Sequence, residues 1–447
     1  MKKFALYFLI VGLTLMSYPA QAVLSAAEEF YLDNGLQVVV VPNHKAPIVK
    51  HIVLYKAGRI DEPQGKGGIA HLLEHLMFRG THKFKDGEFN RLIEQNGGES
   101  NAGTGHDYTY YHQFISLDRL ELAMYLEADR MTGLSFDEKT FAKEREVVYQ
   151  ERQERLNNSP ARDFWEQVNE LFWQGDLHGK PIGGTAEEIK NITGQDILDF
   201  YQKFYTPDNA ILILSGDIDT ETARQLAQKY YGKISPRRIV GETETSKQSP
   251  FGNRHQKYNV SVERDDLKFG RLAALYRLPR YTSDNPLLYA NIILADYLGG
   301  SVTAPLYKKL RLEERLSSSQ AASFDFLSRG DSTFSFYAQM NQKQNNQKIR
   351  RIFFKTLEET KHKLTDRDLQ QVKKRLLSGL IYDNDNPATA AEIVVSWLGS
   401  GYTLADIKNY EDKINRVTRS QVKQALEELQ RTNPFWAEAL PMTEENH

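Results

Sequence analysis

The chain of 447 residues contains no cysteine. This absence excludes disulfide bonds, thiol nucleophiles and cysteine-ligated zinc, so any bound metal must be held by His, Asp or Glu. The chain also lacks a large excess of either charge, because it has 57 basic and 59 acidic residues. A dedicated nucleic-acid-binding protein normally shows a basic excess. We therefore expect no nucleic acid among the partners.

Long apolar runs are also missing beyond the first residues. Residues 4–16, FALYFLIVGLTLM, follow two lysines and precede Ala20-x-Ala22. A positive start, a short apolar run and a small-residue site predict a signal peptide over residues 1–22, with an uncleaved membrane anchor as the alternative. No later stretch approaches the roughly 18 apolar residues of a transmembrane helix. We expect an exported protein in a bacterial periplasm, without a stable membrane span after cleavage.

One order of predicted elements occurs twice along the chain. The length exceeds one ordinary hydrophobic core, so two domains are expected. A polar, Gly- and Ser-containing stretch over residues 241–258 is typical of a linker. Strand, helix, strand-rich and long-helix patterns precede it in residues 23–240 and recur in residues 259–447. We predict an α+β fold of two tandem homologous units, each an α/β sandwich with a sheet packed against helices.

The stretch HLLEH, residues 71–75, could bind a metal. Residues four apart share one face of a helix, so His71 and His75 can reach one ion. Glu74 lies at the edge of that face, which suits a general base acting on a metal-bound water. The pattern is the inverse of the commoner zinc motif. Five residues can match by chance, and the alternative is a helix with two partly buried histidines and a surface glutamate.

A catalytic zinc needs a third protein ligand and one open position. The charged helical stretch KEREVVYQERQER, residues 143–155, supplies candidates. Glu144 and Glu151 are two turns apart on one helix face, so one can ligate the metal while the other orients a histidine. Glu146 and Glu154 are equally eligible from the residues alone, because most carboxylates of such a helix belong to a solvated face.

These segments together resemble the zinc peptidases of the pitrilysin/insulinase type, the inverzincins. HLLEH followed by EREVVYQER is similar to the metal motif of that family, and GGESNAGTGHDYTYYH is similar to the family's GG..NA.T..D.T.Y stretch. The resemblance covers nearly the whole mature chain, including the repeat, and the length fits the short bacterial branch related to processing peptidases. It implies one Zn²⁺ per chain, held by His71, His75 and Glu151, with Glu144 in support and no metal site in the second unit.

The resemblance implies a zinc-dependent endopeptidase that cleaves peptides or unfolded segments inside a clamshell of the two units. Glu74 would activate a zinc-bound water. Asn101 and Ala102 match an edge strand that binds extended substrate, unless this segment forms only a turn. Alternatives are a non-catalytic peptide-binding or assembly subunit and, less favoured with only three ligands, a structural zinc protein. Affinity favours zinc without excluding manganese or cobalt.

The second unit departs from the family pattern. Family members carry an arginine and a tyrosine there that grip the substrate. Arg311 in LRLEERLSSS matches the arginine, whereas Ser318 stands in place of the tyrosine. A serine hydroxyl is too short to replace a phenol. We therefore expect the zinc subunit of a heterodimer whose homologous partner carries the Arg/Tyr pair, or else a homodimer with a modified grip or weak activity.

Overall fold

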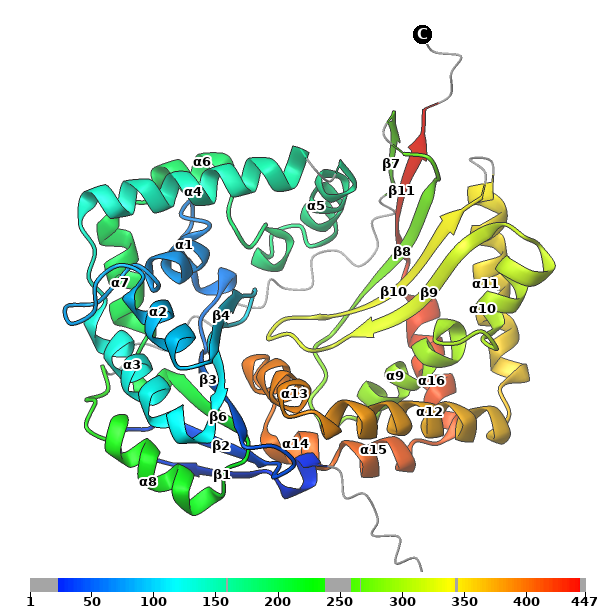
Figure 1. Cartoon of the computed structure of the whole chain (residues 1–447). Helices are drawn as coiled ribbons and strands as arrows, with labels where there is room; N and C mark the ends of the chain where they lie inside the picture. Colours follow the sequence, from blue (N-terminus) through cyan, green and yellow to red (C-terminus); the bar gives the residue numbers. More distant parts are fainter. Residues whose placement is uncertain (1–22, 158–159, 238–258, 266, 342–344, 443–447) are drawn as a thin grey trace, which may run out of the picture.

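The structure is a computed structural model that describes residues 23–157, 160–237, 259–265, 267–341 and 345–442. The predicted signal peptide at 1–22 and the whole of the predicted linker at 241–258 lie outside the described residues. Figure 1 shows two halves, each made of one sheet packed with helices, that face each other like a clamshell. The predicted α+β fold of two tandem units is confirmed.

The first sheet has six strands in the order β1-β2-β6-β3-β5-β4. Its strands are Glu28–Tyr31 (β1), Gln37–Pro42 (β2), Ile48–Tyr55 (β3), Glu99–Thr104 (β4), Thr109–Ser116 (β5) and Ala210–Gly216 (β6). β2 and β6 are parallel, and the other neighbours are antiparallel. The apolar sequence of β6, AILILSG, is buried along its whole length because the strand is central and covered on both faces. β4 lies at the edge.

The second sheet has five strands in the order β7-β11-β8-β10-β9. Its strands are Asn259–Arg264 (β7), Arg271–Leu278 (β8), Ser317–Asp325 (β9), Ser332–Met340 (β10) and Phe435–Pro441 (β11). β7 and β11 are parallel, and the other neighbours are antiparallel. Strand for strand, this topology repeats β2-β6-β3-β5-β4 of the first sheet, so that β9 occupies the edge position that β4 has in the first half.

Helices cover the sheets in both halves. The first half contains α1 (Ile69–Leu76), α2 (Glu88–Gln95), α3 (Leu120–Gly133), α4 (Glu138–Asn157), α5 (Pro160–Phe172), α6 (Ala186–Asn191), α7 (Gly194–Phe204) and α8 (Thr220–Tyr230). The second contains α9 (Pro286–Gly299), α10 (Pro305–Tyr307), α11 (Asn346–Lys363), α12 (Asp366–Asp385), α13 (Pro387–Gly399), α14 (Leu404–Lys408), α15 (Tyr410–Arg416) and α16 (Arg419–Arg431). Short turns of helix are η1 (Val23–Ala26), η2 (Arg59–Asp61), η3 (Leu117–Arg119), η4 (Leu177–Gly179), η5 (Pro207–Asn209) and the π-helical η6 (Lys308–Glu313). Within the described part of the chain, no helix combines the length and apolarity needed to cross a membrane.

One helix of each half packs against the sheet of the other half. α13 of the second half lies against β3 and β6, and its Val394 belongs to the same buried cluster as Ile52 of β3. α5 of the first half packs against β11, where Phe164 shares a buried cluster with Ala273 and Ala437. Because burial of apolar surface is the main stabilising contribution in such contacts, this exchange holds the two halves together.

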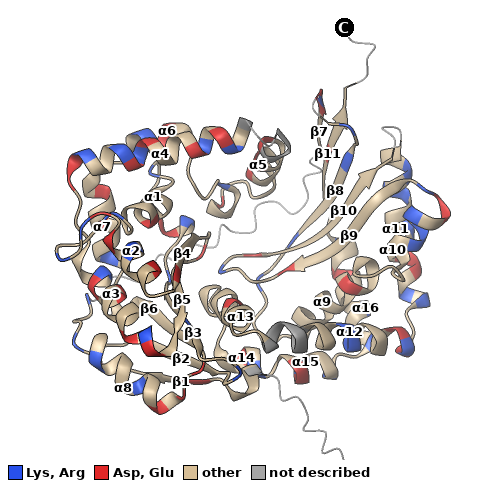
Figure 2. Cartoon of the chain, viewed as in Figure 1, with Lys and Arg blue, Asp and Glu red and all other residues tan. Residues whose placement is uncertain are grey.

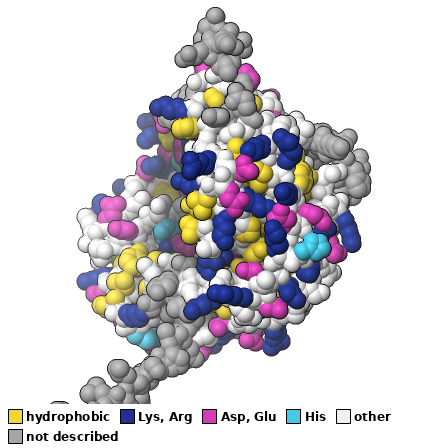
Figure 3. Space-filling view, turned by 90° about the vertical axis from the view of Figure 1, so that its right-hand side faces the viewer, with side chains coloured by type: hydrophobic (Ala, Val, Ile, Leu, Met, Phe, Trp, Pro, Cys, Tyr) yellow, Lys and Arg dark blue, Asp and Glu magenta, His cyan; other side chains and the backbone are white. Residues whose placement is uncertain are grey.

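Charged side chains of both signs are spread over the outer surface. The view in Figure 3 shows Lys, Arg, Asp and Glu interspersed with small apolar patches. Along α4, acidic and basic residues follow each other closely (Figure 2). α4 is also the helix from which the sequence predicts the third metal ligand, so its position relative to α1 decides whether a metal centre can form.

Candidate metal centre

The start of α1 is fixed by glycines and by a buried carboxylate. Gly68 has φ 96°, and a Cβ there would lie 2.7 Å from the carbonyl oxygen of Gly183, so only glycine fits. The backbone N–H groups of Gly68 and Ala70 donate to Glu62 at 2.9 and 2.7 Å, and the guanidinium of Arg59 donates to the same carboxylate at 2.8 Å. Negative charge at a helix start is stabilising. The first turn of α1 is therefore held rigidly.

The two faces of α1 have different roles. Leu72, Leu73 and Leu76 are buried in the core of the first half. His71 and His75 lie on the other face and are turned toward α4, with only 12% and 21% of their side chains exposed. This is the amphipathic pattern of a surface helix, in which the polar stripe meets a second helix instead of solvent.

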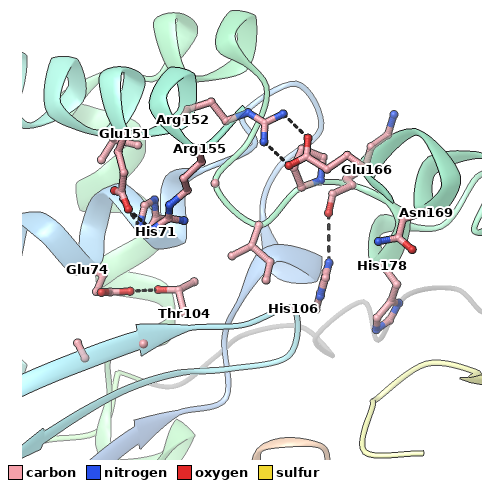
Figure 4. Close-up of a pocket in the computed structure, with 18 residues that line it drawn as sticks. His71, Glu74, Thr104, His106, Glu151, Arg152, Arg155, Glu166, Asn169 and His178 are labelled. Atoms are coloured by element: carbon pink, nitrogen blue, oxygen red, sulfur yellow. Dashed lines mark hydrogen bonds and ion pairs between the residues drawn. The ribbon is translucent and has the colours of Figure 1, made fainter. Parts of the chain in front are cut away.

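The predicted ligands come together. His71 Nε2 lies 3.8 Å and His75 Nε2 lies 3.6 Å from Oε2 of Glu151 on α4 (His71 and Glu151 are labelled in Figure 4). Ligands at about 2.0–2.1 Å from a tetrahedral zinc lie roughly 3.3–3.5 Å apart, close to these separations. Within the described ranges, His71, His75 and Glu151 are the one such group that could hold a metal ion.

The state of the histidines also fits a metal. Burial lowers the pKa of His71 to about 3 and lowers the pKa of His75. Both rings are therefore neutral near pH 7 and have a free lone pair, which a ligating imidazole needs. Two histidines and one glutamate form a recognised catalytic zinc set that leaves a fourth position for water or substrate.

Glu144 lies behind His75, on the side away from Glu151. Its Oε2 is 3.6 Å from His75 Nδ1, and its Oε1 is 3.0 Å from Nε of Arg79. The carboxylate is almost completely buried, with 1% of the side chain exposed. This arrangement agrees with the supporting position that the sequence predicts for Glu144, since a ligating imidazole is normally oriented by an acceptor at its other nitrogen.

Glu74 points to the strand beside α1. Thr104 Oγ1 of β4 donates to Glu74 Oε2 at 2.5 Å (Figure 4). Burial raises the pKa of Glu74, although Thr104 and His75 oppose this shift. A raised pKa brings a carboxylate closer to the range in which it both accepts and returns a proton. Sequence reasoning did not identify Thr104 as a partner of Glu74, because the two residues meet only when β4 packs beside α1.

Two adjoining cavities extend from the metal cluster to the second half. The first, of about 450 Å³, has His71, Glu74, Ala102, Glu151 and Arg155 in its wall (Figure 4). The second has a volume of about 470 Å³, and its wall includes residues of the second sheet. Both cavities are lined by His106, Asn169, His178 and Ile182. A peptide lying beside the metal cluster would therefore contact both halves.

The predicted substrate strand is present. Asn101 and Ala102 lie in β4, paired with His112 and Tyr111 of β5, and therefore in a strand and not in a turn. β4 is the edge strand of its sheet. Ala102 lines the first cavity, whereas the exposed Asn101 is not part of its wall. The strand thus offers an edge to an extended peptide, with Ala102 nearer to the cavity than Asn101.

The second unit does not bring its predicted substrate residue to the cavities. Arg311 is exposed on η6, with its guanidinium 5.9 Å from the ring centre of Tyr307, and it lines neither of the two cavities. η6 packs with α10, α11 and β9. Ser318 is half-buried on β9, with its Oγ 3.5 Å from the carbonyl oxygen of Gln339. Ser318, like Arg311, lines neither of the two cavities.

Charged residues join the halves next to the cavities. Arg329, in the β9–β10 turn, pairs with Asp61 and lies 3.5 Å from Asp107. His178 is 2.7 Å from Asp176 and 3.4 Å from Asp107. Burial alone would lower the pKa of His178, but hydrogen bonds and charge from the two aspartates raise it to about 9. The histidine is therefore positively charged near neutral pH.

Comparisons with known proteins relate the chain to a family of peptidases. The model of the insulinase family (peptidase family M16) matches residues 37–186, and that of the peptidase M16 inactive domain matches residues 191–376. A zinc protease of Helicobacter pylori, PqqE, is 30% identical over 387 residues, which cover 86% of this chain and 85% of the relative. A probable mitochondrial-processing peptidase subunit beta of Schizosaccharomyces pombe is 29% identical over 217 residues, 48% of this chain and 47% of the relative. The crystal structure of a protease from Helicobacter pylori superimposes with a TM-score of 0.82 at 27% identity, covering 93% of this chain and 99% of that one.

Proposed function

Because the chain belongs to the insulinase (M16) family of peptidases, we propose that it is a zinc-dependent endopeptidase that cleaves peptides or unfolded segments. The observation that carries this proposal is the cluster of His71, His75 and Glu151, with the carboxylate of Glu74 beside it at the wall of a cavity. Three ligands leave the open position that catalysis needs, whereas a structural zinc site is normally closed by four.

The residues of the site divide the chemistry between them. Bound zinc would supply a Lewis acid that lowers the pKa of a water to around 7. His71, His75 and Glu151 would hold it. Glu74 takes the proton from the attacking water and returns it to the leaving amine, while Thr104 holds the carboxylate in place through its hydrogen bond of 2.5 Å.

The substrate would bind as an extended strand on the free edge of β4. Main-chain hydrogen bonds from an edge strand hold a peptide without regard to its sequence, and the adjoining cavities receive its side chains. The space between the two halves favours flexible chains, because a folded domain does not enter cavities of about 450 and 470 Å³. This geometry supports peptides and unfolded segments as the substrate class.

The decisive test is hydrolysis of a mixed peptide library by the purified chain, with metal content measured on the same sample. We expect the unchanged chain to cleave peptides and to bind about one zinc ion. We expect Glu74→Gln to lose the cleavage and to keep the zinc. Zinc without cleavage by the chain alone would point to a missing partner subunit. Zinc without cleavage even with proteins captured from the native source would favour the second candidate, a peptide-binding or assembly subunit. Cleavage that survives in Glu74→Gln would refute the role given to Glu74.

The activity is proposed to need a partner chain. Ser318 replaces the tyrosine of the family pattern, and Arg311 lies away from both cavities. Both observations support a zinc subunit whose homologous partner supplies the Arg/Tyr pair. Peptidase rates of the chain alone and with proteins captured from its native source would decide the question. Equal specific activity in the two samples would refute the need for a different partner chain and would indicate a homodimer or a chain that is active by itself.

Export to a periplasm is proposed from the leader-like sequence of residues 1–22 alone. Cell fractionation and N-terminal sequencing of the mature protein test this proposal. A mature chain that starts at Val23 in the periplasmic fraction is expected, and a chain retaining residues 1–22 in the membrane fraction would instead indicate an anchor.

A further inference from the structure

We propose that Arg79 is a positioning residue of the metal centre. It fixes the buried carboxylate of Glu144, which in turn fixes the ring of His75. This inference rests on the proposed metal site and adds one residue to it. Arg79 would act on the ligand His75 through Glu144, which lies between them. Arg79 is not expected to contact either the metal or the peptide.

The three side chains form a continuous chain of contacts. Arg79 follows His75 by one helical turn, just beyond the end of α1. Its Nε is 3.0 Å from Oε1 of Glu144, and Oε2 of the same carboxylate is 3.6 Å from His75 Nδ1. Arg79 and His75 thus hold the two oxygens of one carboxylate from the same side, and the opposite ring nitrogen of His75 faces Glu151.

Burial makes Glu144 dependent on Arg79. Only 1% of its side chain is exposed, and neither carboxylate oxygen has a hydrogen-bond partner in the described part of the chain. Its ion pairs there are with Arg79 and His75. Of these two partners, Arg79 is the one with a permanent full positive charge, so its guanidinium compensates the charge of the carboxylate. A buried carboxylate that loses its one cation is strongly destabilised in its position.

The orientation of Glu144 matters for the ligand. The acceptor at Nδ1 determines which nitrogen of an imidazole carries the proton and how the ring is turned. If Glu144 turns away, His75 loses this constraint and Nε2 is no longer held toward the cluster. Two other guanidinium groups line the first cavity, and they pair with other carboxylates: Arg155 with Glu151 and Arg152 with Glu166.

The first experiment measures zinc affinity by competition with a chromophoric chelator, which needs no turnover. Outer partners of a metal ligand typically contribute roughly 10–100-fold in affinity, so we expect Arg79→Met to weaken zinc binding roughly tenfold and to lower kcat more than it raises KM. Arg79→Lys should recover part of both losses, since it keeps the charge. Arg91→Met on α2 is the control, because Arg91 pairs only with the surface residues Glu88 and Gln95 among the contacts described for it, and its zinc affinity should be unchanged.

A double-mutant cycle separates this role from general stabilisation. If Arg79 acts through Glu144, Arg79→Met should change zinc affinity less than about twofold in a Glu144→Gln background. Wild-type affinity in Arg79→Met, or equal losses in both backgrounds, would overturn the inference. Thermal unfolding of the metal-free variants checks folding, and the partial recovery in Arg79→Lys decides the question if Arg79→Met is unstable.

The outcomes for the two proposals are distinguishable. Zinc binding that depends on Arg79, in a chain that has no peptidase activity even with partner proteins captured from its native source, would refute the proposed enzyme and support the positioning role. Peptidase activity with a zinc affinity that does not depend on Arg79 would support the proposed enzyme and refute the positioning role. A chain that does not bind zinc at all would overturn both.

Discussion

The two halves share one sheet topology, yet they use equivalent helices differently. In chain order, α1 and α4 of the first half correspond to α9 and α12 of the second. His71 and His75 of α1 face Glu151 of α4, whereas α9 and α12 are joined by an ion pair between Asp296 and Arg375. The same scaffold therefore carries either a candidate metal centre or a plain charged contact. A few side chains, and not the fold, determine the chemistry.

The largest expected effect comes from removing a ligand in the first half. Residues that only orient a metal ligand contribute up to roughly 100-fold in affinity. Glu151→Ala removes a ligand itself, so it should lower zinc affinity by more than this factor, and peptide hydrolysis should be lost as well. Metal content after dialysis and peptidase rate are the measurements. Asp296→Ala, which removes the carboxylate from the contact between α9 and α12 in the second half, should leave both unchanged. A loss of zinc in that variant would contradict the contrast between the halves.

The stability of the folded chain should depend on pH through His178, which lies next to the contact between the halves. Its pKa is about 9 in the folded chain and about 6.5 when unfolded, so the bound proton stabilises the fold. This contribution, up to about 3 kcal/mol, is fully present below pH 6.5 and is lost as pH rises through 9. The melting temperature, followed from about pH 6 to about pH 10, should therefore fall.

The variant His178→Gln isolates this contribution. It should melt at a lower temperature near pH 6, where the protonated histidine pairs with Asp107 and Asp176 in the unchanged chain. The two chains should then converge above pH 9. Parallel melting curves across the whole pH range would show that another group is responsible.

A smaller effect is expected at the general base. Thr104→Val removes the hydrogen bond to Glu74, and a hydrogen bond to a charged group contributes about 1.5–3 kcal/mol. We expect kcat to fall roughly tenfold with little change in KM, because the bond orients the base and does not hold the peptide. Thr104→Ser, which keeps the hydroxyl, should retain most of the rate. Equal rates for the chains with valine and with threonine at position 104 would show that Thr104 does not orient Glu74.

The smallest effect is expected in the second half. Arg375→Met breaks the ion pair with Asp296, which is partly exposed, with 35% and 16% of the side chains accessible. Such pairs contribute about 0–1 kcal/mol. Chemical denaturation should show a loss within this range and zinc affinity should not change. A change in zinc affinity would mean that the second half influences the metal centre.

Helical spacing was enough to predict much of the site. His71, Glu74 and His75 lie within one motif, and Glu144 and Glu151 share one face of α4, so periodicity alone places each group on the correct helix. The choice of Glu151 over Glu154 required the resemblance to a known family. Spacing does not say which carboxylate of one helix meets which histidine of another, since that depends on how α1 and α4 pack.

Residues that meet through tertiary packing could not be predicted in this way. Thr104 reaches Glu74 from another strand, and Arg329 reaches Asp61 from the other half of the molecule. Arg79 is a partial exception, because its position one turn after His75 is visible in the sequence, although its carboxylate partner is not. The repeated order of elements likewise predicted two sheets, but not the exchange of α5 and α13. An amphipathic pattern shows which face is buried and not what buries it.

The first half alone is proposed to hold one zinc ion, through His71, His75 and Glu151. The most direct test is an anomalous difference map of zinc-loaded crystals, recorded at energies on both sides of the zinc absorption edge. We predict one strong peak per chain, about 2.0–2.2 Å from the two Nε2 atoms and a Glu151 oxygen. A peak elsewhere, or one closed by a fourth protein ligand, would contradict the account.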